Sequence, residues 1–169
     1  VIQAAIPANQ RSDTEITVKI PHDAGVFYPA GMYRVSTRIM PIGKPLEARE
    51  TDDFPLLLAP KILEINGSPL KDGLISLARV NVDNGQGEVK INLKCSPEVS
   101  SDQPTALLLN DRAIPAEART ETTDLLIFKA KKLEKGKYRL RLRVDGVDSR
   151  LIDKSDPKNL KFDETQQLE

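Results

Sequence analysis

A chain of 169 residues can hold one large domain or two small ones, and its 39% hydrophobic and 30% charged residues predict a folded globular protein. The 25 basic and 25 acidic side chains cancel. A nucleic-acid-binding protein usually carries a positive excess, because neutralising phosphates supplies most of its affinity, so the composition disfavours nucleic acid as a partner. The single cysteine, Cys95, excludes an intramolecular disulfide.

The sequence carries no recognisable membrane or export signal. No apolar run approaches the ~20 residues of a membrane span, so we expect no membrane span. The opening "VIQAAIPANQ" lacks the basic region and long apolar core of a signal peptide. Because the chain begins with Val1 instead of methionine, we expect a fragment of a longer protein or a processed one.

Short alternating runs bounded by turn residues follow one another along the chain, which predicts an all-β protein. The first run, "TEITVKIP", places Ile16, Val18 and Ile20 on one side before Pro21 ends it. The next, "MYRVSTRI", follows Gly31.

The second half of the chain adds two predicted hairpins and two further segments. "ISLARVNVDNGQGEVKINLKC" predicts strands around an Asn84-Gly85 turn, and "TALLLNDRAI" predicts a hairpin at Asn110-Asp111. "DLLIFKAKKL" fits a buried strand as well as a short helix. "YRLRLRV" (138–144) alternates arginine with leucine and valine. Strands at this spacing predict an immunoglobulin-like β-sandwich.

Two segments of the chain resemble each other. "AGMYRVSTRI" (30–39) aligns with "KGKYRLRLRV" (135–144) at an offset of about 105 residues, in keeping with two related units. We place the boundary between the units at Pro60. Residues 1–59 are then a partial or reduced immunoglobulin-like module, and residues 60–167 are one complete immunoglobulin-like sandwich.

The strings "GKYRLRLRVDGVDSRLIDKS" and "FDETQQ", together with "DDFPLLLAPKI", give the chain a family resemblance. They resemble the C-terminal region of the tube-terminator, or cap, proteins of contractile injection systems, the phage-tail-like particles of bacteria. In that family, immunoglobulin-like modules follow a domain that closes the inner tube. That tube-closing domain has no counterpart here. Residues 168–169 depart from the expected β-like ending, and we interpret them as a vector remnant.

Arg139, Arg141 and Arg143 form an arginine ladder along one side of the predicted strand 138–144. Alternate residues of a strand face opposite ways, and long basic stems often cover the edge of a sheet with their charged ends in water. A contact surface for an acidic protein, or for nucleic acid, is the alternative. Interleaved aromatic side chains, on which bases could stack, are missing. The pattern therefore favours a solvated face.

Other residues that could carry chemistry have simpler explanations. "VDGVDS" and "VDNGQG" lack the alternating acids of a calcium loop and predict turns. His22, the only histidine, has no nucleophile motif near it and predicts a loop residue. Cys95 alternates with Ile91 and Leu93 along the same predicted strand, so we expect its thiol to be buried with them. We therefore expect no enzyme, no cofactor and no metal site.

From the resemblance we expect a structural module of an injection particle that contacts tube or sheath proteins. It implies assembly in the cytoplasm, with export or release as part of the particle. The alternative from a different class is an accessory β-sandwich domain that binds carbohydrate or a cell surface. Sugar platforms favour exposed tryptophan and tyrosine, whereas this chain has no tryptophan and three tyrosines, Tyr28, Tyr33 and Tyr138.

Overall fold

The computed structural model describes residues 28–40, 43–70, 82–83, 88–133, 136–153, 158–163 and 166–168. These residues confirm the all-β prediction, because the one helical element among them is a 3₁₀ turn at Pro45–Glu47. The strands are β1 (Gly31–Val35), β2 (Arg38–Ile39), β3 (Arg49–Glu50), β4 (Phe54–Leu58), β5 (Lys61–Ile65), β6 (Ser68–Pro69), β7 (Val82–Asp83), β8 (Glu88–Val99), β9 (Thr105–Leu109), β10 (Arg112–Pro115), β11 (Thr123–Lys131), β12 (Tyr138–Val144), β13 (Val147–Asp148), β14 (Ile152–Asp153), β15 (Lys161–Phe162) and β16 (Gln167–Leu168).

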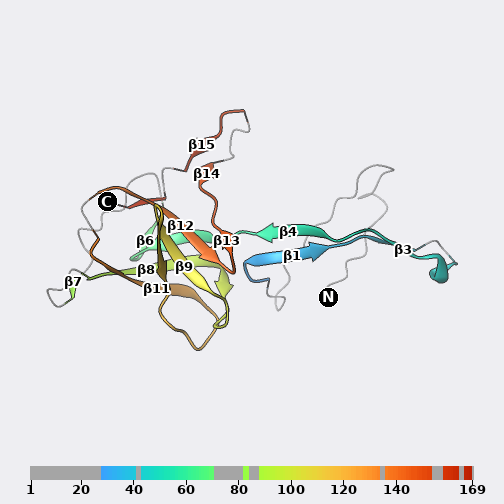
Figure 1. Cartoon of the computed structure of the whole chain (residues 1–169), viewed down its shortest axis with the longest axis horizontal. Coiled ribbons are helices and arrows are strands. Elements are labelled where there is room, and N and C mark those ends of the chain that lie inside the picture. The colour runs from blue at the N-terminus through green and yellow to red at the C-terminus, as the bar shows by residue number, and fades with distance from the viewer. Residues whose placement is uncertain are drawn as a thin grey trace.

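Two antiparallel sheets form a β-sandwich (Figure 1). One sheet has the order β11-β8-β5-β6, with β7 also paired to β8. The other has the order β10-β9-β12-β13, with β16 also paired to β12. Both sheets contribute to a single core of buried side chains, because Ile91 and Phe128 of the first lie in the same cluster as Leu107 and Leu142 of the second. Whether the sandwich is immunoglobulin-like in detail stays a prediction.

The segment "DLLIFKAKKL", whose sequence fitted a buried strand as well as a short helix, lies in strand β11. β11 pairs antiparallel with β8, with a shift in register between Thr123 and Leu125. Leu126, Phe128 and Ala130 point into the core, whereas the residues between them are partly or fully exposed. The period of two in this burial pattern is that of a strand packed on one face.

Turn residues close the hairpins where the sequence predicted them. Asp145 and Gly146, within "VDGVDS", both have positive φ, 49° and 79°, and connect β12 to β13. Two consecutive residues of positive φ form the tight hairpin turn that matches the twist of paired strands. Asn110, at the predicted β9–β10 turn, also has positive φ. These stretches form turns, as the sequence analysis expected.

A two-stranded ribbon projects from the sandwich, and we call it the arm (residues 31–58; Figure 1). β1 pairs with β4 from Gly31↔Leu58 to Val35↔Phe54, and β2 then pairs with β3. The 3₁₀ turn lies near the far end of the arm. Pro60 stands between β4 of the arm and β5 of the sandwich, at the predicted domain boundary, which itself stays a prediction.

The related segments 30–39 and 135–144 have different surroundings. β1 lies in the arm, where Met32 and Val35 are exposed, whereas β12 lies in the sandwich with Leu140 and Leu142 fully buried. Several predictions fall outside the described residues: the strand around Ile16–Ile20, His22, and the Asn84-Gly85 turn, which follows β7.

Candidate interaction surfaces

The arginine ladder lies on the outward side of β12, and its charged ends contact groups of the same chain. Leu140, Leu142 and Val144 between them are fully buried. Arg141 Nη1 and Arg143 Nη2 each donate to Asp148 Oδ2 at 3.0 Å, and Arg143 Nε donates to Asp148 Oδ1. A partner that binds Arg141 or Arg143 would therefore have to compete with Asp148.

The third arginine of the ladder has an aromatic neighbour. The guanidinium carbon of Arg139 lies 4.1 Å from the centre of the Phe162 ring, within the range of a cation–π contact. A hydrogen bond from Arg143, followed by the charges of Arg143 and Arg141, holds the pKa of Asp148 below its usual value. The same hydrogen bond raises the pKa of Arg143. The ladder is thus linked to β13 and β15.

The base of the arm is fixed to the sandwich by hydrogen bonds. Gln103 Nε2 donates to the carbonyl of Ala30 at 2.7 Å, and Ala30 is itself buried in the core cluster. A side chain at Gly31 would have its Cβ 3.3 Å from Asp145 Oδ2, and the φ of +154° at this glycine disfavours any other residue. The arm therefore starts from a constrained position.

Arg119 holds the loop to which the arm is bonded. Its guanidinium donates to the carbonyls of Ser100 and Gln103 and to Thr105 Oγ1, at distances from 2.6 to 3.1 Å. Burial lowers the pKa of Arg119, but an arginine stays charged at any ordinary pH. No sequence motif marks this residue, because its acceptors are mostly backbone carbonyls.

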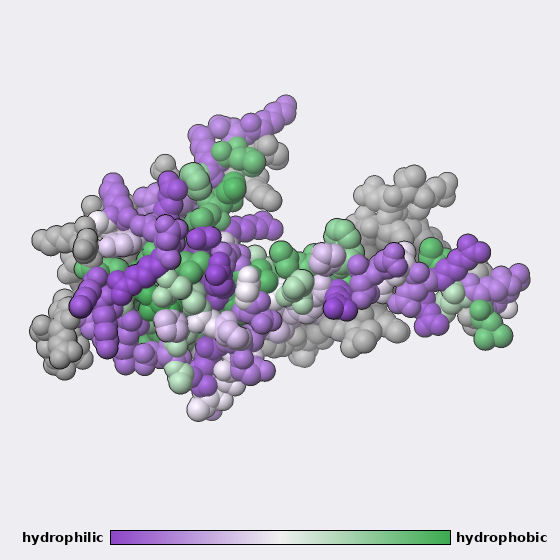
Figure 2. Space-filling view, in the orientation of Figure 1, coloured by the Kyte–Doolittle hydropathy of each residue, from purple (hydrophilic) through white to green (hydrophobic). Residues whose placement is uncertain are grey.

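The arm carries most of the large hydrophobic side chains that are exposed among the described residues. There are twelve such side chains, and eight of them lie on the arm. These eight are Met32, Val35, Ile39, Met40, Leu46, Phe54, Leu56 and Leu57. Figure 2 shows apolar surface along the arm, interrupted by polar side chains. Exposed apolar patches of this kind mark contact sites in soluble proteins.

Both faces of the arm carry apolar side chains. Met32 stands opposite Leu57 on one face, and Val35 stands opposite Phe54 on the other. Phe54 is 71% exposed. Two ion pairs lie on the arm, Arg34 with Asp53 at 3.7 Å and Lys44 with Glu47 at 2.9 Å.

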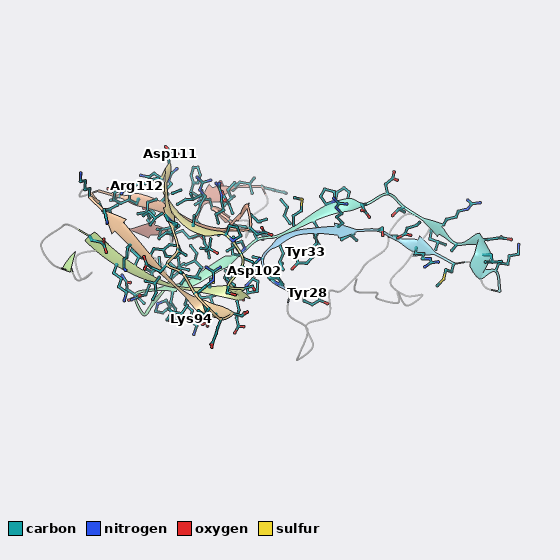
Figure 3. The ribbon with its side chains drawn as sticks, turned by 60° about the horizontal axis from the view of Figure 1, so that its bottom comes forward. Tyr28, Tyr33, Lys94, Asp102, Asp111 and Arg112 are labelled. Atoms are coloured by element: carbon teal, nitrogen blue, oxygen red, sulfur yellow. The ribbon has the colours of Figure 1, made fainter. Side chains whose placement is uncertain are left out.

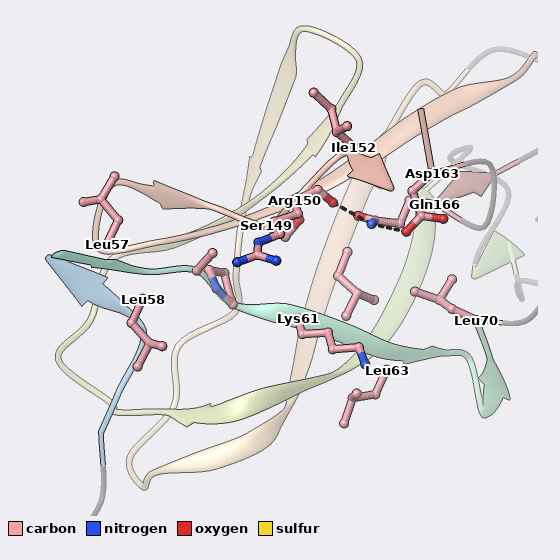
Figure 4. Close-up of a pocket in the computed structure, with 13 residues that line it drawn as sticks. Leu57, Leu58, Lys61, Leu63, Leu70, Ser149, Arg150, Ile152, Asp163 and Gln166 are labelled. Atoms are coloured by element: carbon pink, nitrogen blue, oxygen red, sulfur yellow. Dashed lines mark hydrogen bonds between the residues drawn. The ribbon is translucent and has the colours of Figure 1, made fainter. Parts of the chain in front are cut away.

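A groove of about 560 Å³, which we call the basal groove, lies where the arm meets the sandwich (Figure 4). The end of β4 and the start of β5 form one wall, and the other is formed by Ser149, Arg150, Ile152, Asp163 and Gln166. The apolar part of the lining includes Leu57, Leu58, Ile62, Leu63, Leu70 and Ile152.

Polar groups of the basal groove come from widely separated parts of the chain. Gln166 Nε2 donates to the carbonyl of Arg150 at 2.6 Å and to Asp163 Oδ2 at 2.9 Å (Figure 4). Gln166 Oε1 is buried without a hydrogen-bond partner. The side chains of Lys61 and Arg150 are exposed and make no ion pair within the described residues.

A family model described as Domain of unknown function (DUF8756) matches residues 72–166, more than half of the chain. The chain belongs to this family. No curated protein and no solved structure matches it. The DUF8756 match includes β7 to β15 and one wall of the basal groove, whereas the arm, β5 and β6 precede it.

The cysteine and the tyrosines that the sequence analysis considered for chemistry lie elsewhere in this DUF8756 chain. Cys95 is buried, as predicted, and burial raises the pKa of its thiol to about 12. Three tyrosines are half-buried, Tyr28 and Tyr33 (labelled in Figure 3) and Tyr138. The Tyr33 hydroxyl donates to the Pro29 carbonyl. Within the described ranges, no three His, Cys, Asp or Glu side chains gather as metal ligands. None of these ranges forms a helix long and apolar enough to cross a membrane.

Proposed function

We propose that this chain is a non-catalytic assembly module of a contractile injection particle, and that it acts through contacts with other proteins of the particle. The observation that carries the proposal is the arm, which holds eight of the twelve exposed large hydrophobic side chains among the described residues. Burying such side chains against a partner removes apolar area from water, which contributes a favourable free energy of about 25 cal/mol per Å² buried.

The position of the arm supports this role. The side chain of Gln103 donates a hydrogen bond to the backbone at the base of the arm, so the arm extends from the sandwich in a defined direction. An element held in place before it meets its partner loses less conformational entropy on binding. The sandwich would then act as a rigid support, and the arm as its contact element.

Two further observations support the proposal. The strings around 136–155 and 162–167 resemble the C-terminal region of tube-terminator proteins. The strand orders β11-β8-β5 and β10-β9-β12-β13 are compatible with the two sheets of an immunoglobulin-like sandwich, as that family has. The partners are then tube or sheath proteins of a particle that assembles in the cytoplasm, and the chain is exported or released as part of that particle.

Binding between purified proteins tests the proposal. The chain is mixed with the tube protein or the sheath protein of a contractile particle from the same bacterium, and association is measured by analytical ultracentrifugation. We expect association with one of them, and a weaker association for Phe54→Asp on the arm. Leu125→Asp is the matched control, because Leu125 is exposed on β11 of the sandwich. Absence of association with both proteins would contradict the proposed function.

A further inference from the structure

The polar wall of the basal groove is held in place by the chain itself. The backbone carbonyl of Gln166 accepts a hydrogen bond from the Leu140 amide at 2.9 Å, which fixes this residue beside β12. Its side-chain nitrogen donates to the Arg150 carbonyl at 2.6 Å and to Asp163 Oδ2 at 2.9 Å (Figure 4). Both partners of this nitrogen are acceptors, so the orientation of the amide is determined and its oxygen is the atom that remains.

That oxygen, Gln166 Oε1, is a buried acceptor in the wall of the groove. Gln166 lines the groove and is only 9% exposed, and Oε1 has no hydrogen-bond partner among the described residues. Buried polar atoms are nearly always paired, because an unpaired atom has lost its hydration without a replacement. An oriented acceptor at this place therefore favours a ligand that brings an N–H or O–H group.

The neighbouring charges favour an uncharged ligand. The Asp163 carboxylate lies beside Gln166 and lines the groove with it, so it opposes an entering acid. Lys61 and Arg150 also belong to the lining, and they oppose an entering cation. Because both signs of charge surround the groove, a neutral group with N–H donors meets the least electrostatic resistance there.

The apolar part of the lining is aliphatic. It consists of Leu57, Leu58, Ile62, Leu63, Leu70 and Ile152. A volume of about 560 Å³ lies within the usual range of ligand pockets, which is ~300–1,000 Å³. No aromatic ring occurs among the described lining residues, so the groove is suited to a branched aliphatic side chain and offers nothing on which a flat ring could stack.

The groove is also continuous with the arm. Leu57 is 60% exposed, belongs to the apolar surface of the arm and lines the groove as well. A protein that covers the arm therefore lies next to the groove. An extended segment of such a protein presents side chains alternately to either side and carries backbone N–H groups between them. It supplies both groups that the lining favours, an aliphatic side chain and an uncharged N–H donor.

We propose that the basal groove is a peptide-binding site: an uncharged, extended segment of the protein bound by the arm inserts one leucine- or isoleucine-sized side chain into the groove and donates a backbone N–H to Gln166 Oε1. The inference rests on the proposed function, because it identifies the part of the arm's partner that is held at the base of the arm. The arm itself stays in contact with that same partner.

A capped amino acid tests the site without any particle protein. N-acetyl-leucine N-methylamide has an aliphatic side chain, two amide N–H groups and no charge. We expect it to shift the side-chain amide resonances of Gln166 saturably, with a dissociation constant on the order of millimolar. N-acetylglycine N-methylamide lacks the side chain and should bind about tenfold more weakly. Equal binding of the two compounds, or no saturable shift with the leucine compound, would overturn the inference.

The charge of the probe tests the uncharged character of the ligand. N-acetyl-leucine has the same side chain but ends in a carboxylate, which Asp163 opposes. We expect it to bind more weakly than the capped compound. Tighter binding of the acid would show that Lys61 and Arg150 determine the ligand, and would overturn the assignment of a neutral segment.

Substitutions in the lining show whether the shifts come from the groove. Ala59 lines the groove, and Ala59→Trp should fill it and weaken binding of the capped leucine at least about tenfold. Ala113→Trp is the matched control, because Ala113 is exposed on β10. Ile152→Ala removes part of the lining without filling the groove, should weaken binding about threefold, and decides the matter if Ala59→Trp does not fold. Unchanged binding in the folded variants would overturn the inference.

Sedimentation with the tube or sheath protein separates this inference from the proposed function. We expect Ala59→Trp to weaken that association about tenfold, and Ala113→Trp to leave it unchanged. A chain that associates through Phe54 but does not bind the capped leucine would overturn the peptide site and leave the proposed function standing. A chain whose groove binds the capped leucine, but which associates with neither particle protein, would uphold the peptide site and contradict the proposed function.

Discussion

The side-chain amide of Gln103 donates a 2.7 Å hydrogen bond to the carbonyl oxygen of Ala30, across 73 positions of the sequence. Its amide oxygen accepts a hydrogen bond from the Ser100 backbone at 3.1 Å, and Arg119 donates to the Gln103 carbonyl. One side chain thus joins the arm to a loop that is itself held in place. This connection holds the base of the arm against the sandwich.

Replacing Gln103 should loosen the base of the arm. We expect Gln103→Ala to lower the free energy of unfolding by about 1–2 kcal/mol, because the Ala30 carbonyl and the Ser100 amide lose a partner in a half-buried position. Amide hydrogen exchange should become faster in β1 and β4. Lys90→Ala, at an exposed position of β8, should change stability by less than ~0.5 kcal/mol. Unchanged exchange in the arm would show that other contacts fix its base.

The sandwich should fold without the arm. Apart from Ala30, every residue of the buried core cluster lies between Ile62 and Val144. We therefore expect residues 60–167, expressed alone, to show a β-type circular dichroism spectrum and one cooperative thermal transition. A molten or aggregated product would contradict the domain boundary at Pro60, and would indicate that preceding residues complete the core.

The sequence predicted those features that follow from local pattern. The alternation of Leu140 and Leu142 with arginine predicted a strand with one buried face, and the structure has this strand. Asp145-Gly146 predicted a turn because few residue pairs accept positive φ so readily. Cys95 was predicted to be buried from its parity with Leu93, and it is. In each case the determining information lies within a few residues.

The arm and the basal groove depend on contacts that no local pattern contains. "MYRV" and "FPLLL" have the composition of sandwich strands, and nothing in them indicates that Met32 and Phe54 remain exposed. The groove combines β5 with residues about 90 positions later in the chain, such as Arg150. The pairing of Arg141 and Arg143 with Asp148 was also missed, although a β-hairpin across Asp145-Gly146 places these residues side by side.

Acid should remove the stabilisation that Asp148 provides. Its pKa is lowered in the folded protein, first by the hydrogen bond from Arg143, so the folded state favours the carboxylate relative to the unfolded chain. The contribution is complete well above the unfolded value of about 3.9 and is lost as the pH falls through the lower folded pKa. The difference in unfolding free energy between wild type and Asp148→Asn should therefore shrink toward zero between about pH 5 and pH 2. A difference independent of pH would show that the carboxylate charge is not involved.

The thiol of Cys95 should be inert in the folded protein. It is fully buried, and its pKa is raised to about 12, so almost none is present as the reactive thiolate at mildly alkaline pH. We expect no reaction with a thiol reagent in native buffer and complete reaction in concentrated guanidinium chloride. An exposed thiol introduced by Leu125→Cys provides the positive control. Rapid labelling of the wild-type chain in native buffer would contradict the burial of β8.

The arginine ladder should not make this chain a nucleic-acid-binding protein. Two of its three guanidinium groups are paired with Asp148 and the third lies over Phe162, so binding phosphates would have to compete with these contacts. The chain as a whole has no net charge to attract a polyanion. We expect dissociation constants for duplex and single-stranded DNA of about 10⁻⁴ M or weaker at physiological salt, the level of non-specific binding. Changing Arg139, Arg141 and Arg143 together to Ser should leave this weak binding almost unchanged. Micromolar binding that decreases steeply with salt and disappears in the triple variant would instead identify the outer face of β12 as a nucleic-acid surface.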